Sequence, residues 1–171
     1  MLWKKVSSRP MKNAGSFVLS DILSPATIQL NLKSANRDLV LEELVNAIPE
    51  LAEQPESRQT LLKALYEREQ LHSTGIGDGI ALPHARNALV GLVDRAIIIF
   101  GRHPVGIDYG AIDRVPARLF FLLIAPTVTQ HLAILARISR VLRDARVRQG
   151  LLTANSPDLV IQIIREAEAK L

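Results

Sequence analysis

Two short and nearly continuous apolar segments constrain the fold of this chain more than any other feature. Residues 94–101 read DRAIIIFG, and residues 117–124 read ARLFFLLI. A strand with one face in water alternates apolar and polar side chains, whereas a central strand covered on both faces is apolar at successive positions. Both segments therefore predict central strands of a sheet that lies between two layers of other elements.

Segments with helical periodicity lie on both sides of these strands in the sequence. A shorter alternating segment at 26–32 predicts a first strand, and a further short strand is expected at 105–108. Asn36 is placed to cap the first helix, and Ser156, followed by a proline, is placed to cap the last one. The predicted helices cover residues 37–53, 57–71, 128–146 and 157–169.

This order of elements predicts an α/β fold in a single domain, with a central mixed β-sheet flanked by helices on both faces. The length of 171 residues fits one domain. Residues 1–15 lack periodicity and are interpreted as a flexible basic leader, which leaves residues 16–171 as the domain. The leader carries four bases and no acid, and the seventeen bases that remain of twenty-one equal the seventeen acids. The net charge of +4 therefore lies in the leader.

Composition excludes several classes of function. The chain has no cysteine, which excludes disulfides, thiolate metal sites, iron–sulfur clusters and cysteine nucleophiles. Its longest apolar run, 119–125, has seven residues, whereas a membrane-spanning helix needs roughly 18–20. Aromatic residues make up 4% of the chain, too few for the stacking surface of a typical nucleic-acid binder. We therefore expect a cytoplasmic protein that is not embedded in a membrane and binds no nucleic acid.

The main reactive side chains are the four histidines, His72, His84, His103 and His131. Their separations of 12, 19 and 28 residues differ from the closely spaced ligand pairs of a zinc site, so we predict no metal. The glycine-rich segment at 75–79 reads GxGxG and follows a predicted helix, and no GxxxxGKS or GxxxxGKT motif occurs. We therefore predict no nucleotide and no other cofactor.

The segment at 73–84 has a more specific shape. Its three glycines permit positive φ angles and a close approach of backbone amides to an anion, and we interpret the segment before residue 80 as a loop. Pro83 restricts Leu82 to an extended conformation, so His84 is delivered at the end of an extended segment. A neutral imidazole is a competent nucleophile near pH 7. Taken alone, His84 also fits a surface or structural role.

The string from residue 65 to residue 84, LYEREQLHSTGIGDGIALPH, resembles the active-site signature of the enzyme IIA components of the phosphoenolpyruvate-dependent phosphotransferase system. The similarity is to the fructose/mannitol class, which includes the nitrogen-regulatory IIA proteins. The segment GIDYGAIDRVP at 106–116, the LIAP that ends the second apolar strand, and the QHL at 130–132 also resemble this family. Together these segments cover residues 20–168, nearly the whole predicted domain.

The resemblance implies a phosphotransferase that works through a phosphohistidine. His84 matches the histidine that receives a phosphoryl group from a phosphohistidine on the carrier protein HPr or a relative of it. Arg68 matches the active-site arginine, whose planar charged fork suits the equatorial oxygens, and His131 matches a second active-site histidine that can donate a hydrogen bond. No nucleotide or Mg²⁺ is required. Further phosphoryl contacts are expected from the loop residues Ser73, Thr74, Gly75, Gly77 and Gly79.

The residues themselves leave other interpretations open. Arg68 lies between two glutamates, which also fits a solvated helix face, and His131 near a helix start also fits a capping or packing role. A hydrolase pair of Ser73 or Thr74 with the histidine at 84 lacks the GxSxG elbow. The remaining histidines, at positions 72 and 103, are expected at the surface.

Two features of the sequence depart from the family or are not explained by it. Many members have glycine after the reactive histidine, where this chain has Ala85, and this puts the choice of phosphoryl donor in doubt. A basic stripe of arginines fits a solvated face better than a docking surface for an acidic partner. The stripe consists of Arg137, Arg140, Arg143, Arg146 and Arg148.

The step after phosphorylation divides the family. The chain has no IIB cysteine, permease span or linker, which favours the nitrogen-regulatory branch, whose members bind regulatory target proteins. The alternatives are a sugar-specific relay of the fructose/mannitol type that feeds a IIB domain and a permease, and a binding module that phosphorylation switches without sugar transfer.

Overall fold

A five-stranded mixed sheet forms the centre of the described part of the chain. The computed structural model describes residues 17–86 and 91–171, so the predicted leader lies outside the described residues. The strand order is β1-β4-β5-β3-β2. β4 and β5 pair antiparallel, β1 runs parallel to β4, β3 runs parallel to β5, and β2 is antiparallel to β3. The bounds are β1 Ile28–Gln29, β2 Gly75–Gly77, β3 Ile80–Ala81, β4 Ile97–Ile107 and β5 Ala117–Ile124.

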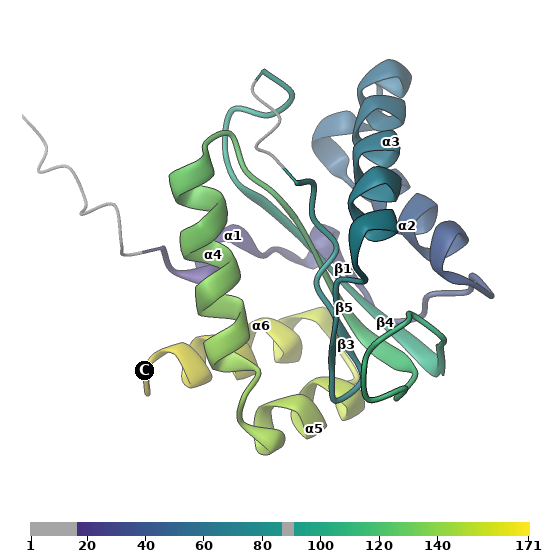
Figure 1. Ribbon diagram of the computed structural model, residues 1–171. Helices are drawn as coiled ribbons and strands as arrows, with labels where there is room; N and C mark the ends of the chain where they lie inside the picture. Colours follow the sequence, from purple (N-terminus) through teal and green to yellow (C-terminus); the bar gives the residue numbers. More distant parts are fainter. Residues whose placement is uncertain (1–16, 87–90) are drawn as a thin grey trace, which may run out of the picture.

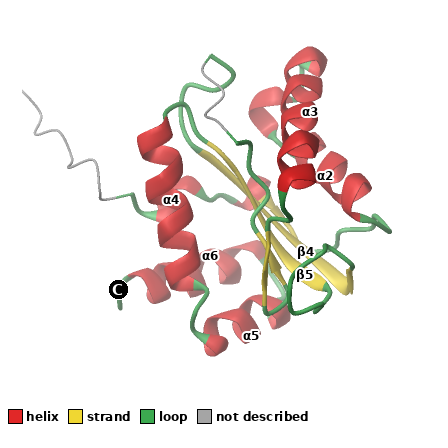
Figure 2. Ribbon diagram, in the orientation of Figure 1, coloured by secondary structure: helices red, strands yellow, loops and turns green. Residues whose placement is uncertain are grey.

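Helices cover both faces of this sheet (Figure 1). One layer consists of α2 (Arg37–Asn46) and α3 (Pro55–Leu71). The other layer consists of α1 (Leu19–Ile22), α4 (Val128–Val141), α5 (Ala145–Thr153) and α6 (Pro157–Glu168). Figure 2 shows the strands between these two groups of helices, which confirms the predicted fold class. No helix in the described ranges has the length and apolar character needed to cross a membrane.

Successive side chains of β5 belong to two different hydrophobic cores. Leu119, Phe121 and Leu123 pack with α4, α5 and α6, whereas Phe120 and Leu122 pack with α2 and α3. All five side chains are buried. A strand with this environment needs apolar residues at every position, which explains the continuous run that the sequence shows and confirms its assignment as a central strand.

Two predicted helices end earlier than their periodicity indicates. The helix predicted for 37–53 ends at Asn46, because Pro49 holds Ile48 extended and begins a separate 3₁₀ turn over Pro49–Leu51. The helix predicted for 128–146 is divided into α4 and α5. Asp144 is extended there, and its side chain accepts the backbone N–H of Arg146, which makes it the N-cap of a new helix.

The strand boundaries also differ from the prediction. The first strand, expected over 26–32, is limited to the two residues of β1, which pair with β4. The segments predicted at 94–101 and 105–108 form one strand, β4, whose pairing with β5 is irregular between Arg102 and Ile107. Gly106 has a φ of 98° at this irregularity, a conformation that glycine adopts without strain.

Glu168 at the end of α6 joins three helices. Its buried carboxylate accepts the backbone N–H groups of Leu19 and Ser20 in α1 at 2.7 and 2.9 Å, and Nε of Arg137 in α4 at 2.6 Å. We expect Glu168→Ala to lower the free energy of unfolding by about 2–4 kcal/mol, because three donors lose a charged acceptor. Urea unfolding measures this loss.

The matched control is Glu166→Ala, which removes an exposed carboxylate from the same helix. Its side chain accepts from Gln162 at 3.1 Å in a solvent-exposed pair, so we expect a change within about 0.5 kcal/mol. Equal losses for the two variants would contradict the role assigned to the buried carboxylate.

Candidate active site

His84 lies just beyond the end of β3, where the chain is still attached to the central strand of the sheet. The carbonyl of Pro83 accepts the backbone N–H of Leu123 at 3.0 Å, and His84 forms a parallel bridge with the same residue of β5. The following Ala85 is buried and has no positive φ, so the backbone at this position does not require a glycine.

His131 approaches His84 from α4, the helix that follows β5. β5 runs parallel to β3, so the two strands end at the same edge of the sheet, and α4 begins immediately after β5. Thr127 caps α4 by accepting the backbone N–H of Gln130, which sets the first turn that carries His131. The centroids of the two imidazole rings are 5.2 Å apart, at an interplanar angle of 57°. The structure thus brings together two histidines that are distant in sequence.

The hydrogen bonding of His84 selects one of its two ring nitrogens for chemistry. Nδ1 lies 2.6 Å from the carbonyl oxygen of Leu82. A carbonyl only accepts, so Nδ1 carries the proton, and in the neutral ring Nε2 keeps its lone pair. The ring of His131 makes no hydrogen bond with the described residues, which leaves its N–H free to donate.

Both imidazoles are held toward the neutral form. Burial lowers the pKa of His84 below its usual 6.5, the nearby charge of Arg68 acts in the same direction, and the Leu82 carbonyl and Glu69 oppose them. Burial also lowers the pKa of His131, with a further contribution from His84. A neutral ring at pH 7 is the form that a nucleophile needs.

The titration of His84 provides a test of these electrostatics. We expect its midpoint below 6.5, a rise in Arg68→Ala, where a repelling charge is removed, and a fall in Glu69→Gln, where an attracting charge is removed. NMR titration of the imidazole resonances measures each midpoint. A fall in Arg68→Ala, or a rise in Glu69→Gln, would be inconsistent with the placement of the two charges.

Arg68 lies in the last turn of α3, and its guanidinium is held by the chain that follows. Nη1 donates to the carbonyl of His72 at 2.5 Å. Arginine has five N–H donors, and this is the one hydrogen bond that Arg68 makes among the described residues. The half-exposed guanidinium therefore keeps donors available near His84, whose pKa its charge lowers.

Glu69 is a residue of this region that the sequence analysis missed. Its side chain is buried, and its carboxylate accepts the backbone N–H of Thr74 at 2.9 Å, the hydroxyl of Thr74, and the hydroxyl of Tyr109 at 2.8 Å. A signal was present in the sequence. Glu69 continues the buried stripe of Leu61 and Leu65 at a spacing of four residues, and a carboxylate at such a position needs polar partners.

The glycine-rich segment is a hairpin and not the predicted loop, and its turn lies away from the histidines. β2 and β3 pair antiparallel, and Gly77 and Gly79 take positive φ angles of 91° and 77° at the turn between them. The chain from Gly79 to His84 is mostly extended, which separates the two by roughly 16 Å. The expectation that these two amides contact the phosphoryl group is therefore not supported, because β3 carries the turn and the histidine at opposite ends.

The other predicted loop contacts are occupied by the protein itself. The hydroxyl of Ser73 donates to the carbonyl of Tyr109 at 2.5 Å and accepts the backbone N–H of Gly75 at 3.0 Å. Thr74 is buried and bound to Glu69. These residues fix the connection between α3 and β2 and do not present free donors to the histidine pair.

The two remaining histidines differ from each other. His72 is exposed, as predicted. His103 is buried, which corrects the expected surface position. Its Nε2 lies 2.9 Å from the carbonyl of Ser34, and its Nδ1 accepts the backbone N–H groups of Val105 and Gly106. His103 therefore organises the irregular part of β4. Within 17–86 and 91–171, no group of histidine, aspartate and glutamate side chains is arranged to hold a metal ion.

The predicted basic stripe is not a continuous free surface. Arg137 pairs with Glu168 at 2.6 Å, and Arg148 donates to the carbonyls of Leu142 and Arg143 at the end of α4. These two side chains therefore stabilise the packing of α4 against α5 and α6.

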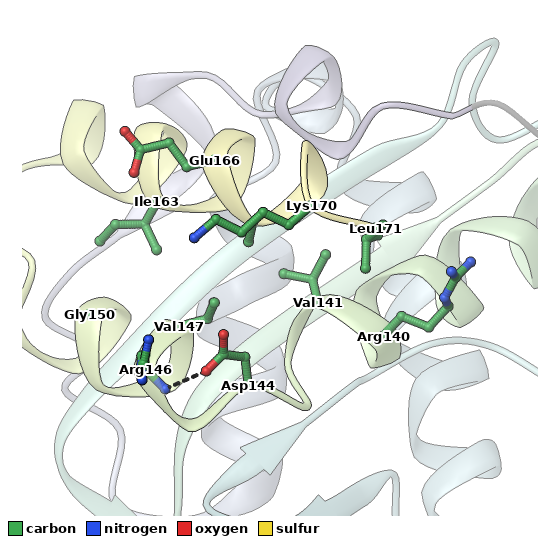
Figure 3. A pocket seen from close by; sticks show the side chains of 11 residues that line it. Arg140, Val141, Asp144, Arg146, Val147, Gly150, Ile163, Glu166, Lys170 and Leu171 are labelled. Carbon is green, nitrogen blue, oxygen red and sulfur yellow. Dashed lines mark hydrogen bonds between the residues drawn. The ribbon is translucent and has the colours of Figure 1, made fainter.

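Two other arginines of the stripe line a cavity of about 380 Å³ (Figure 3). Arg140, Arg146 and Lys170 share its wall with Asp144 and Glu166, so charges of both signs are present. Arg140 at its wall is nine positions after His131 in α4, a rise of roughly 14 Å along the helix. The cavity includes no residue of the predicted site.

The chain has the fold of a phosphotransferase-system IIA protein, and a family model matches most of its length. The fold matches the crystal structure of the nitrogen regulatory protein IIA-Ntr from Neisseria meningitidis with a TM-score of 0.75, at 29% sequence identity, over 86% of this chain and 99% of that one. The family model described as "Phosphoenolpyruvate-dependent sugar phosphotransferase system, EIIA 2" matches residues 21–167. The chain belongs to this family.

Relatives in both branches of the family are similar to the chain. It is 38% identical over 150 residues to the fructose-specific EIIABC component of the phosphotransferase system of Bacillus subtilis, covering 86% of this chain and 23% of that protein. It is 32% identical over 153 residues to a nitrogen regulatory protein of Pseudomonas aeruginosa, covering 88% of this chain and 96% of that protein. The family is established, and the branch is not decided by identity.

Proposed function

We propose that the protein is a phosphocarrier whose His84 accepts a phosphoryl group from a phosphohistidine on an HPr-type protein. Nε2 of the neutral ring attacks phosphorus, the new N–P bond forms, and the donor's N–P bond breaks with its electron pair returning to the donor nitrogen. The single observation that supports this most directly is the Nδ1 hydrogen bond to the Leu82 carbonyl, beside a second histidine ring at 5.2 Å. It leaves one nucleophilic nitrogen in a defined place.

Two neighbours supply what the transferred group requires. Transfer needs in-line alignment of the two nitrogens and neutralisation of charge on the equatorial oxygens. Arg68 offers free guanidinium donors, and His131, whose pKa is lowered by burial, offers a neutral ring N–H. The Leu82 carbonyl retains the Nδ1 proton and so stabilises the ring once Nε2 is phosphorylated. No cofactor takes part.

The test is to incubate the protein with phosphoenolpyruvate, enzyme I and HPr. We expect an acid-labile, base-stable phosphate on His84, attached at Nε2, located by peptide mass spectrometry and by the ³¹P chemical shift. Omission of HPr is the matched control and should prevent labelling. Failure to label with a competent donor, or a phosphate at another residue, would overturn the proposal.

For the onward step, we propose the nitrogen-regulatory type, in which phosphorylation controls binding to a regulatory target protein. The fold match to the nitrogen regulatory protein IIA-Ntr from Neisseria meningitidis, with a TM-score of 0.75 at 29% identity, supports it. A sugar-specific relay to a IIB domain is the second candidate, favoured by the identity of 38% to the Bacillus subtilis protein. Transfer of label from the phosphorylated protein to a purified fructose-type IIB domain would support the relay. Retention of label together with phosphorylation-dependent capture of a regulator would support the switch.

A further inference from the structure

We propose that Glu69 is a positioning residue for phosphoryl transfer: by holding Thr74, its buried carboxylate fixes the His72 carbonyl, which in turn holds the Arg68 guanidinium. This role rests on the proposed function, because it concerns the arginine that would contact the phosphoryl oxygens. Glu69 makes no hydrogen bond to either histidine. Its charge acts on the pKa of His84, and its effect on the position of the transferred group runs through Arg68.

The burial of Glu69 is the first step of the argument. Its side chain is 4% exposed and shares a helical stripe with two leucines of the core. Within the described residues its carboxylate makes no salt bridge. Three hydrogen bonds from Thr74 and Tyr109 offset the free-energy cost of burying the charge. An uncompensated buried carboxylate is strongly unfavourable, and a leucine would continue the stripe at lower cost. A carboxylate here therefore points to a requirement for its hydrogen bonds.

Those hydrogen bonds immobilise the connection between α3 and β2. Thr74 is bound through both its backbone N–H and its hydroxyl. Tyr109 joins α3 to this connection, since its hydroxyl donates to Glu69 and its carbonyl accepts the hydroxyl of Ser73. Burial and the nearby carboxylate raise the pKa of Tyr109 well above 10, so its hydroxyl stays a donor. The Tyr109 ring packs on Phe120 of β5, with centroids 5.6 Å apart.

The immobilised connection carries the carbonyl that holds Arg68. His72 lies two residues before Thr74, and its carbonyl accepts Nη1 of Arg68 at 2.5 Å. An arginine side chain is long and flexible, and fixing one of its nitrogens reduces the freedom that must be lost when the remaining donors meet a phosphoryl group. The contacts thus run from the core carboxylate through the backbone to the guanidinium.

A double-mutant cycle with Arg68 tests the proposal. The rate of phosphoryl transfer from phospho-HPr is measured by rapid quench in the wild type, Glu69→Ala, Arg68→Ala and the double variant. A displacement of about 1 Å in a catalytic group can cost about 10²-fold in rate, and we expect a loss of roughly 10- to 100-fold in Glu69→Ala. Because Glu69 acts through Arg68, the double variant should be no slower than Arg68→Ala, within about threefold.

Conservative variants separate positioning from general loss of structure. In Glu69→Gln the amide oxygen can accept the Thr74 N–H while the amide nitrogen donates to the two hydroxyl oxygens, so we expect transfer roughly tenfold faster than in Glu69→Ala. Thr74→Val keeps the carboxylate and removes one of its donors, so it should also slow transfer. This variant provides the test if Glu69→Ala does not fold. Glu67→Ala removes an exposed acid on the other side of Arg68 and should leave the rate unchanged.

The outcomes distinguish this inference from the proposed function. A wild type that accepts no phosphoryl group overturns the proposed function and this inference with it. A wild type that is labelled, with losses that multiply in the double variant, overturns the positioning role alone. So does a Thr74→Val variant that transfers at the wild-type rate. Non-additive losses, with recovery in Glu69→Gln, establish the role.

Discussion

Replacing His84 with alanine is expected to abolish phosphoryl acceptance completely. The substitution removes the ring nitrogen of His84 that carries a free lone pair in the neutral tautomer. The ring of His131, with its centroid 5.2 Å away, does not occupy the place of that nitrogen. Radiolabelled phosphoenolpyruvate with enzyme I and HPr measures the stoichiometry. We expect about one phosphate per chain in the wild type and none above background in His84→Ala.

The control for this experiment is His72→Ala, which removes an exposed imidazole from the end of α3 and leaves its backbone carbonyl in place. It should be labelled like the wild type. Folding of both variants is checked by circular dichroism, since His84 is half-buried and makes one hydrogen bond to the backbone. A folded His84→Ala protein that is labelled to the same extent as His72→Ala would disprove the assignment of the phosphorylated residue.

Arg68→Ala is expected to slow phosphoryl transfer by about 10²- to 10³-fold, the range found when one donor that stabilises developing charge is removed. The loss should appear mainly in the rate of the chemical step and less in the apparent affinity for the donor, because the guanidinium serves the transferred group. Its effect on folding should be small, at most about 1 kcal/mol, since the side chain is half-exposed and donates one hydrogen bond.

Arg68→Lys separates charge from geometry. Lysine keeps the positive charge but has no planar fork, so we expect a rate between those of the wild type and Arg68→Ala. Rapid-quench measurements over a range of phospho-HPr concentrations, with urea unfolding in parallel, provide both readouts. A rate equal to that of the wild type in a folded Arg68→Ala protein would show that Arg68 does not assist phosphoryl transfer.

The sequence was sufficient to predict the layers of the fold because β5 is buried on both faces, and burial on both faces is visible as an uninterrupted apolar run. The division between α4 and α5 was not predictable from periodicity, since apolar residues continue through it. It depends on Asp144, which caps α5 in the folded chain and which in a sequence reads equally well as a polar residue on a helix surface.

Two histidines named from the sequence are brought together in the structure, and the carboxylate that supports this region was missed. The two histidines and Arg68 were found through the resemblance of the signature, and strand pairing brings the histidines together. The glycines at 77 and 79 were misplaced, because positive φ angles identify a turn but not the end of β3 at which it lies. Glu69 was missed, because its three hydrogen bonds come from residues that only the folded chain gathers around it.

The hydrogen bond between Nδ1 of His84 and the Leu82 carbonyl limits how donor and recipient proteins can use the site. In the proposed phosphocarrier, arrival and departure of phosphorus share a single nitrogen, so a donor and a recipient cannot be docked at the same time. Each must leave before the other enters, and long-lived complexes would halt the exchange. Such a carrier works best with brief, mutually exclusive encounters, and the fraction of chains that bear phosphate then reports the balance between supply and demand.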